Sequence, residues 1–287
     1  MNVQSLVSRD YSNSWRDFAT DLFKYEDADP GYLLLKRSGL DRNTMLRYVM
    51  AWCTYYNPGI AAVACQYQGQ KFWDYLFAVY ATAQRASERR HFRGTAGMQA
   101  LHQWSCSKPE ALIEGTYGRT YLDVRKNMQG IAQMGDYFYW KLADVWDTVF
   151  DMPVDFTECE KYMPKVPKQG AELINASLDR RYYPKYGADG WLVDTMRPIT
   201  QHIQGVPYKG KKPGVKLALQ EAETVCCVFK QHVKGKHRMG TRTLKAYRRL
   251  LSVQHESKNA RKLLDGLHAG GIWTPARLDT VFSFVQP

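Results

Sequence analysis

The segment 220–240, QEAETVCCVFKQHVKGKHRMG, gathers acidic, thiol, amine and imidazole side chains on one predicted helix. On that helix Glu223 and Lys230 share a face about 10 Å apart along the axis, too far for a direct ion pair. Glu221 and His232 share a different edge. Carboxylates, imidazoles and amines are the usual groups of general acid–base catalysis. The segment therefore points to a catalytic or binding element, with solvated surface charge as the plain alternative.

A second cluster, ERRHFRG at 88–94, closes a helix that the apolar spacing predicts over residues 71–90. Arg90, His91 and Arg93 bring cations and hydrogen-bond donors together at its end. Arginine forks suit bidentate recognition of phosphate. We therefore predict an anion site here, although cations at a helix C-terminus are also favoured by the helix dipole alone.

Residues 128–155 have the pattern of a helix–hairpin–helix element, because an apolar segment runs into QMGDY and a strong helix follows. Gly135 permits a tight turn, and N–H groups at the start of the next helix can cradle a DNA phosphate. The alternative is an ordinary packing turn with Gly135 as a cap. Helix–hairpin–helix DNA glycosylases carry a catalytic aspartate after such a helix. Asp155 is the analogue here, but their catalytic lysine is not evident, so base excision is not favoured.

Several common catalytic motifs are missing from the sequence. It has no GxxxxGK[ST] phosphate loop, no GxGxxG after a strand, no GxSxG, no HExxH and no HxE…PCxxC signature. These absences argue against kinase, dehydrogenase, simple hydrolase and zinc-deaminase functions.

The six cysteines form no CxxC pair and show no zinc spacing, so we expect free thiols in a reducing compartment.

Together these segments resemble one family, the amino acid:DNA transferases of bacteriophages, also called α-glutamyl/putrescinyl-thymine pyrophosphorylases. The resemblance spans most of residues 45–245 and includes YYNPGIAAVA at 55–64 and GIAQMGDYFYWKLADVW at 130–146. The family pattern falls on Arg90, Phe92, Arg93, Gly94, Lys141, Ala143, Asp144, Glu221, Glu223, Thr224, Cys227, Lys230, His232 and Gly235. The sequence departs from it at Val228 and at residues 235–238, which leaves the donor amine open.

The resemblance implies a fold related to helix–hairpin–helix glycosylases and a reaction on hypermodified thymine in DNA. The implied substrate is 5-(pyrophosphoryloxymethyl)deoxyuridine, which a separate kinase makes from hydroxymethyluracil. The amine of a free amino acid or a polyamine displaces pyrophosphate from the exocyclic methylene. Glycine is the first donor expected, and serine, glutamate and putrescine remain open. No cofactor is specified, and a requirement for a divalent metal such as Mg²⁺ remains open.

The implied chemistry divides the candidate residues by role. Cations neutralise the pyrophosphate leaving group, and the candidates are Arg90, His91, Arg93 and Lys141. The attacking amine must be neutral, so a base is needed, and the candidates are Asp144, Glu223 and His232. Lys230 is a candidate clamp for the carboxylate of an amino-acid donor.

Positive charge is concentrated in the C-terminal third of the chain. Of 40 Lys/Arg and 28 Asp/Glu, residues 201–262 hold 15 Lys/Arg and only three acids. A local basic surface on an otherwise balanced chain is typical of a protein that binds nucleic-acid phosphates. An acidic small molecule or a solvated face is the alternative. The predicted DNA-binding residues are Gly135, Lys209, Lys211, Lys212, Lys234, Lys236 and Arg238.

The apolar spacing predicts an all-α protein. Side chains spaced by three and four define amphipathic helices over 71–90, 137–150 and 216–233, and further helices are expected at 243–251 and 257–267. Seven prolines interrupt residues 151–215. We therefore expect a helix–hairpin–helix glycosylase-like bundle over 1–150 with the hairpin near 130–140, a loop-rich connection over 151–215, and a basic helical part over 216–287 on the same core.

The sequence contains no apolar run of membrane-spanning length and no apolar signal region at its N-terminus. We expect a cytosolic protein, in the host cytoplasm if phage-encoded, with no membrane partner.

Two other functions stay open besides the transferase. One is a DNA glycosylase of the helix–hairpin–helix superfamily, which would release a base. The other is a non-catalytic DNA-binding protein.

Overall fold

The computed structural model describes residues 2–82, 95–131, 135–156, 159, 162–178, 190–211 and 217–285. These residues form sixteen helices and no β-strand. The predicted all-α fold is therefore confirmed. The chain divides into two compact units, each built from segments that are distant in the sequence.

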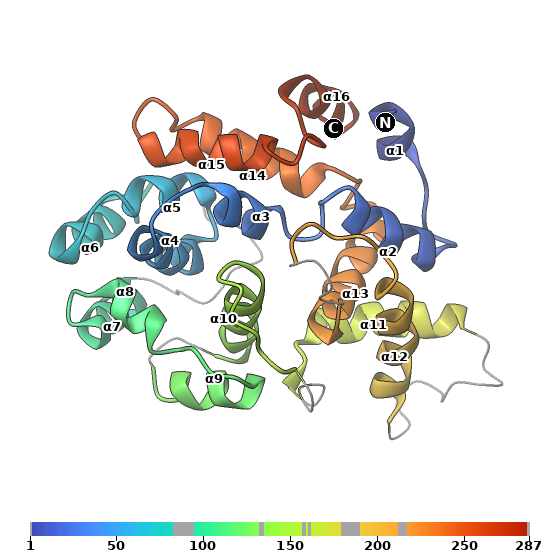
Figure 1. Ribbon diagram of the computed structural model, residues 1–287, viewed down its shortest axis with the longest axis horizontal. Helices are drawn as coiled ribbons and strands as arrows, with labels where there is room; N and C mark the ends of the chain where they lie inside the picture. The colour runs from blue at the N-terminus through green and yellow to red at the C-terminus, as the bar shows by residue number, and fades with distance from the viewer. Residues whose placement is uncertain are drawn as a thin grey trace. The chain divides into compact units, whose positions relative to one another are not determined.

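Unit 1 comprises Met1–Pro30, Asp155–Leu244 and Gly271–Pro287. It contains α1 (Val3–Ser8), α2 (Trp15–Lys24), α11 (Lys165–Ser177), α12 (Trp191–Ile203), α13 (Leu219–Val233), the first turn of α14 (Thr241–Leu251) and α16 (Pro275–Val285). Helix α13 packs against α2, α11 and α12 (Figure 1). It is therefore the central helix of this unit.

The contact between α11 and α13 is close enough to require a glycine. A Cβ atom added at Gly170 would lie 1.9 Å from the carbonyl oxygen of Cys226, so no other residue fits without moving a backbone. Helix α13 is consequently buried on nearly all sides, charged residues included. The predicted amphipathic helix thus has the expected apolar stripe but lacks the solvated opposite face.

Unit 2 comprises Gly31–Val154 and Lys245–Gly270. Its helices are α3 (Pro30–Arg37), α4 (Arg42–Tyr55), α5 (Pro58–Ala64), α6 (Gly69–Ala78), α7 (Thr95–Ser105), α8 (Pro109–Glu114), α9 (Tyr121–Met128), α10 (Asp136–Thr148), the rest of α14, and α15 (Lys258–His268). Helix α4 packs against α5 and α8, α15 against α5, and α9 against α10. Large buried aromatic rings, among them Trp73, Trp140 and Trp146, fill this interior.

Four of the five predicted helices, α10, α13, α14 and α15, lie close to their expected bounds. The helix predicted over 71–90 is too long, because α6 ends at Ala78. There the Val79 N–H bonds the Tyr75 carbonyl at 3.0 Å and the Tyr80 N–H bonds the Phe77 carbonyl at 3.2 Å. These bonds tighten and close the last turn.

The proline-rich stretch 151–215 holds two helices of 13 residues each, α11 and α12. Pro167 lies in the first turn of α11, where a missing N–H costs nothing, and Pro198 lies within α12. The three-part division into 1–150, 151–215 and 216–287 stays a prediction about domains. The compact units begin and end elsewhere, at Pro30, Val154, Leu244 and Gly270.

None of the six cysteines, all of which the structure describes, forms a disulfide. Burial raises the pKa of Cys65 to about 12 and that of Cys226 well above its ordinary value. Both are therefore neutral thiols near pH 7. Each helix among the described residues is too short or too polar to cross a lipid bilayer.

Candidate active site

Glu223 and Lys230 of α13 lie in the interior of unit 1, where their side chains are 2% and 8% exposed. The Lys230 amine donates to Gln169 Oε1 on α11. Burial lowers the pKa of Lys230, and the positive charge of Lys234 lowers it further. Neither residue is solvated surface charge, which removes the plain alternative for this helix.

A second carboxylate, which the sequence did not reveal, lies near Glu223. Thr224 Oγ1 is 3.4 Å from Glu223 Oε2 and 3.1 Å from Asp29 Oδ2. Because a hydroxyl has one proton, Thr224 donates to only one of the two carboxylates at a time. Arg242 pairs with Asp29 Oδ1 at 2.9 Å. Two acids, a hydroxyl and a guanidinium thus form one polar cluster in unit 1.

Asp27 is fully buried and caps the start of α14. Its carboxylate accepts hydrogen bonds from the Gly240 N–H at 2.8 Å, the Thr243 N–H at 3.1 Å and the Thr243 hydroxyl at 2.7 Å. His237 Nε2 lies 3.4 Å away. Burial raises the pKa of Asp27 to about 6, although these hydrogen bonds oppose the rise. Asp27 is therefore a structural cap whose ionisation is costly.

This burial gives a testable pH dependence. The pKa of Asp27 rises from 3.8 to about 6 on folding, so its contribution to stability is present below pH 4 and is lost as pH rises through 6. Relative to Asp27→Asn, we expect the wild-type free energy of unfolding to fall by about 2 kcal/mol between pH 4 and 7. Urea unfolding of both proteins across this range measures the difference. If the two pH curves run parallel, the assignment is wrong, because a constant offset between them reports only the altered hydrogen bonds of asparagine.

His232 is held through both ring nitrogens. Its Nε2 accepts the Tyr11 N–H at 3.1 Å, and its Nδ1 lies 3.1 Å from the carbonyl oxygen of His237. Nδ1 can donate to that oxygen only when it carries a hydrogen, and Nε2 also lies 3.5 Å from Asp10 Oδ1. The ring links the N-terminal segment to the loop after α13. This geometry favours a positioning role over proton transfer.

Glu221 stabilises the start of α13. Its carboxylate accepts the Ala218 N–H at 2.7 Å and pairs with Lys211 at 2.9 Å. Both side chains of this pair are buried. Lys211, predicted from the sequence to contact DNA, is therefore engaged inside unit 1, because the acid at the helix start needs a cation once both are removed from water.

The other basic candidates fall into two groups. Lys209, Lys234, Lys236 and Arg238 are exposed on unit 1. Arg90, His91, Arg93 and Lys212 lie outside the described residues. The exposed group can reach a phosphate backbone without any rearrangement of the interior.

Lys141 and Asp144 of α10 form a buried ion pair in unit 2. Lys141 Nζ is 3.4 Å from Asp144 Oδ2, and the side chains are 8% and 5% exposed. The amine also lies 5.7 Å from the centre of the Tyr32 ring. The spacing of three residues brings the two groups to one face of the helix. Breaking such a buried pair leaves an uncompensated charge.

The turn before α10 contains two glycines with different conformations. Gly135 is the N-cap of α10 with φ −103°, whereas Gly130 has φ +89°, the left-handed conformation that favours glycine. Arg125 pairs with Asp136 at the first position of α10. Residues 132–134 lie outside the described residues. The helix–hairpin–helix assignment and the role of Gly135 in DNA binding therefore stay predictions.

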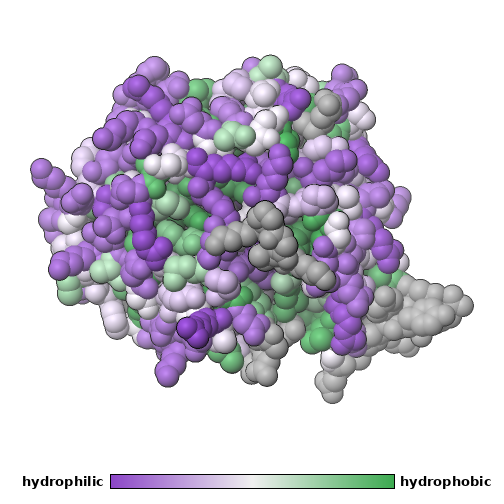
Figure 2. Space-filling view, viewed as in Figure 1, coloured by the Kyte–Doolittle hydropathy of each residue, from purple (hydrophilic) through white to green (hydrophobic). Residues whose placement is uncertain are grey.

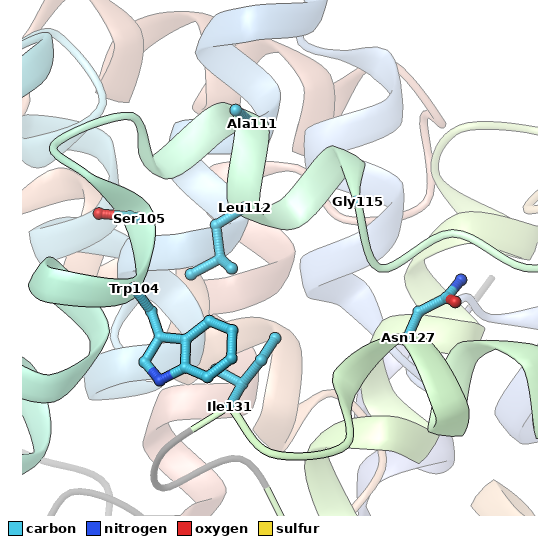
Figure 3. Close-up of a pocket in the computed structure, with 7 residues that line it drawn as sticks. All are labelled: Trp104, Ser105, Ala111, Leu112, Gly115, Asn127 and Ile131. Carbon is cyan, nitrogen blue, oxygen red and sulfur yellow. The ribbon is translucent and has the colours of Figure 1, made fainter.

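Unit 2 contains an open pocket of about 290 Å³. Figure 3 shows the residues that line it, which are Trp104, Ser105, Ala111, Leu112, Gly115, Asn127 and Ile131. The Trp104 side chain is 52% exposed there. None of the lining residues titrates near neutral pH, so this pocket does not supply acid–base chemistry. Within the described parts of the chain, no three His, Cys, Asp or Glu residues are placed to share a metal ion.

Comparison with known proteins identifies the family. A sequence profile of the amino acid:DNA transferases matches residues 10–237 of the 287. The chain belongs to the amino acid:DNA transferase family. The resemblance noted from the sequence motifs is thereby confirmed, and so is the prediction that the protein is a transferase.

Two phage proteins are similar to this amino acid:DNA transferase over most of its length. The glycinyltransferase of Pseudomonas phage PaMx11 is 28% identical over 259 residues, covering 80% of this chain and 87% of the relative. The putrescinyltransferase of Delftia phage PhiW-14 is 26% identical over 248 residues, covering 83% and 78%. These relatives are named for two different amine donors.

The acidic residues of EDADP (26–30) are the part of the transferase that sequence reasoning missed. They lie in a loop, so no periodicity marks them, and a run of acids ordinarily indicates solvated surface. Asp27 and Asp29 are instead buried against α13 and α14. The available signal was the excess of cations in the C-terminal third, since cations drawn into the fold, such as the partly buried Arg242, need carboxylate partners.

Proposed function

We propose that this transferase attaches the amine of an amino acid or a polyamine to 5-(pyrophosphoryloxymethyl)deoxyuridine in DNA. The observation that carries the proposal is the family match over residues 10–237. In the reaction, the amine nitrogen bonds to the exocyclic methylene carbon, and the carbon–oxygen bond to pyrophosphate breaks. The nitrogen then gives one proton to a base, and pyrophosphate leaves with the electron pair.

We assign the base role to Glu223. Its carboxylate is buried on the central helix of unit 1, and a carboxylate shielded from water strongly stabilises the positive charge that develops on the neutral amine as its nitrogen bonds to carbon. It can therefore hold the donor and take its proton. Lys230, whose amine lies on the same helix, would hold the carboxylate of an amino-acid donor. His232 would position the loop after α13, since both its nitrogens already have partners.

A second set of residues would stabilise the leaving group. Lys141, together with Arg90 and Arg93 of the ERRHFRG segment and the neighbouring His91, would neutralise the departing pyrophosphate. Asp144 would hold the Lys141 amine in place. A divalent metal such as Mg²⁺ is compatible with this step, and parallel reactions with and without a chelator decide whether it is needed.

The exposed cations Lys209, Lys234, Lys236 and Arg238 would hold the DNA backbone, with Gly135 at the turn before α10. The modified thymine is the base acted on, and glycine is our first choice of donor. The two relatives are phage proteins, and phage DNA is copied in the host cytoplasm. We therefore place the reaction there.

The test is a donor panel on DNA that contains the pyrophosphorylated base. Purified protein is incubated with this DNA and with glycine, serine, glutamate or putrescine, and pyrophosphate release is measured. We expect release that depends on one amine and is absent with hydroxymethyluracil DNA, because hydroxide is a poor leaving group. Release without any amine, or DNA binding without release for every amine, would contradict the proposed function.

A further inference from the structure

Helices α14 and α15 carry exposed cations in unit 2 that have no role in the chemistry proposed above. Residues 245–262 contain six Lys/Arg and one acid. Arg249 is partly buried and donates to the Tyr56 carbonyl at 3.1 Å. The five exposed residues are Lys245, Arg248, Lys258, Arg261 and Lys262, and they are called the α14–α15 basic face below.

Close backbone contacts fix the direction in which this face points. A Cβ atom at Gly59 would lie 2.3 Å from the Arg249 carbonyl oxygen, and one at Gly266 would lie 2.5 Å from the Leu34 carbonyl oxygen. Because these contacts allow little rotation of α14 or α15, the opposite, basic side is held toward solvent. Figure 2 shows mainly hydrophilic side chains at the upper left, where Figure 1 places α15.

The start of α15 is fixed as firmly. The Ser257 hydroxyl donates to the Ala62 carbonyl at 2.8 Å, and its oxygen caps the Ala260 N–H at 3.3 Å. Asn259 also donates to Cys65 Sγ at 3.3 Å. The basic side chains of α15 therefore project from a rigid element, which lowers the ordering cost of binding.

The cations at the start of α15 lie where the helix dipole disfavours positive charge. Lys258 is its first residue, Arg261 and Lys262 follow within five residues, and its first turn has no acid. The N-terminus of a helix carries partial positive charge, so cations there are unfavourable. Glu256, just before the Ser257 cap, is the nearest acid in the sequence. Helix stability alone does not account for this placement. An anionic partner would relieve the repulsion between these cations and the helix N-terminus.

The face also has the composition of a polyanion-binding surface. Lys245, Lys258 and Lys262 form no ion pair within the part of the chain that the structure describes. Of the large apolar side chains exposed on the described residues, one, Leu251, lies here. Protein interfaces need a more apolar centre and fewer lysines. A phosphate backbone is the partner that matches exposed lysines without ion pairs beside exposed arginines.

We propose that the α14–α15 basic face binds the phosphate backbone of duplex DNA. It would do so independently of base sequence, since Lys and Arg at exposed positions supply charge rather than base readout. The inference rests on the proposed function only in taking DNA as the partner. It adds a DNA contact on unit 2 to the unit 1 lysines named above.

The test compares two pairs of exposed lysines in the same unit. The double variant Lys258→Ala/Lys262→Ala removes two charges from the face, and Lys71→Ala/Lys108→Ala removes two charges elsewhere on unit 2. Binding to a short fluorescent duplex of ordinary DNA is followed by anisotropy at several salt concentrations. We expect the first variant to bind about tenfold more weakly at low salt. Its slope of log K against log salt should be smaller by about two, one for each lysine. The control should keep the wild-type slope.

Each other outcome overturns the proposal. If both double variants bind DNA equally weakly, the loss of affinity depends on net charge and not on this face. If neither variant binds more weakly, the DNA lies elsewhere on the protein. Because the assay uses unmodified DNA and no amine, an inactive wild type that still shows the lysine effect would contradict the proposed function alone.

Discussion

Replacing Glu223 with glutamine is expected to slow product formation by about 10²–10⁴-fold while the protein stays folded. Glutamine keeps the shape of the side chain and an oxygen for the Thr224 hydroxyl, which lies 3.4 Å from Glu223 Oε2. It cannot take a proton from the attacking amine, however. Single-turnover kinetics on the pyrophosphorylated DNA measure the loss, and circular dichroism confirms the fold.

Glu221→Gln is the matched control, because Glu221 lies two residues away on the same buried helix. Its carboxylate serves the Ala218 N–H and Lys211. This variant should therefore lower the melting temperature and leave turnover of the folded protein near normal. The base assignment fails if Glu223→Gln turns over at a near-normal rate, or if the two variants lose activity equally.

The second large effect is expected at the Lys141–Asp144 pair of α10. Asp144→Asn leaves a buried lysine without its carboxylate at 3.4 Å, so we expect a loss of about 3–5 kcal/mol of stability. We also expect the rate to fall by about 10²–10³-fold, because Lys141 then no longer faces the leaving group correctly. Urea unfolding and single-turnover rates below the unfolding transition give the two quantities.

The double variant Lys141→Met/Asp144→Asn separates structure from catalysis. It removes both charges, so stability should recover toward the wild-type value. The rate should stay as low as in the single variant, because Lys141 no longer contributes its charge to the pyrophosphate. Recovery of both stability and rate would show that the pair is structural only.

The sequence predicted the all-α fold and four helices because their apolar residues repeat with the helical period, which is a local property. The end of α6 at Ala78 was missed, since the apolar spacing continues beyond the last helical hydrogen bond. The central position of α13 depends on Gly170, more than fifty residues away from Cys226. Such a long-range contact leaves no periodic trace in the sequence.

Motif reasoning placed Glu223, Lys230, Lys141 and Asp144 on helices, and the structure shows all four to be buried. It could not show that Lys211 is engaged by Glu221 or that both nitrogens of His232 have partners. Those facts depend on which segments meet across a core. Asp29 was missed for the same reason, because only the fold brings it to Thr224.

Mass spectrometry of intact nucleosides tests the central claim most directly. DNA that contains pyrophosphorylated hydroxymethyluracil is incubated with the protein and isotope-labelled glycine or putrescine, then digested to nucleosides. If the protein is this transferase, we expect a nucleoside that has lost pyrophosphate, gained the labelled amine on its methylene, and kept its glycosidic bond. A released free base with an abasic site would contradict it, as would unchanged nucleosides with every amine while the DNA remains bound.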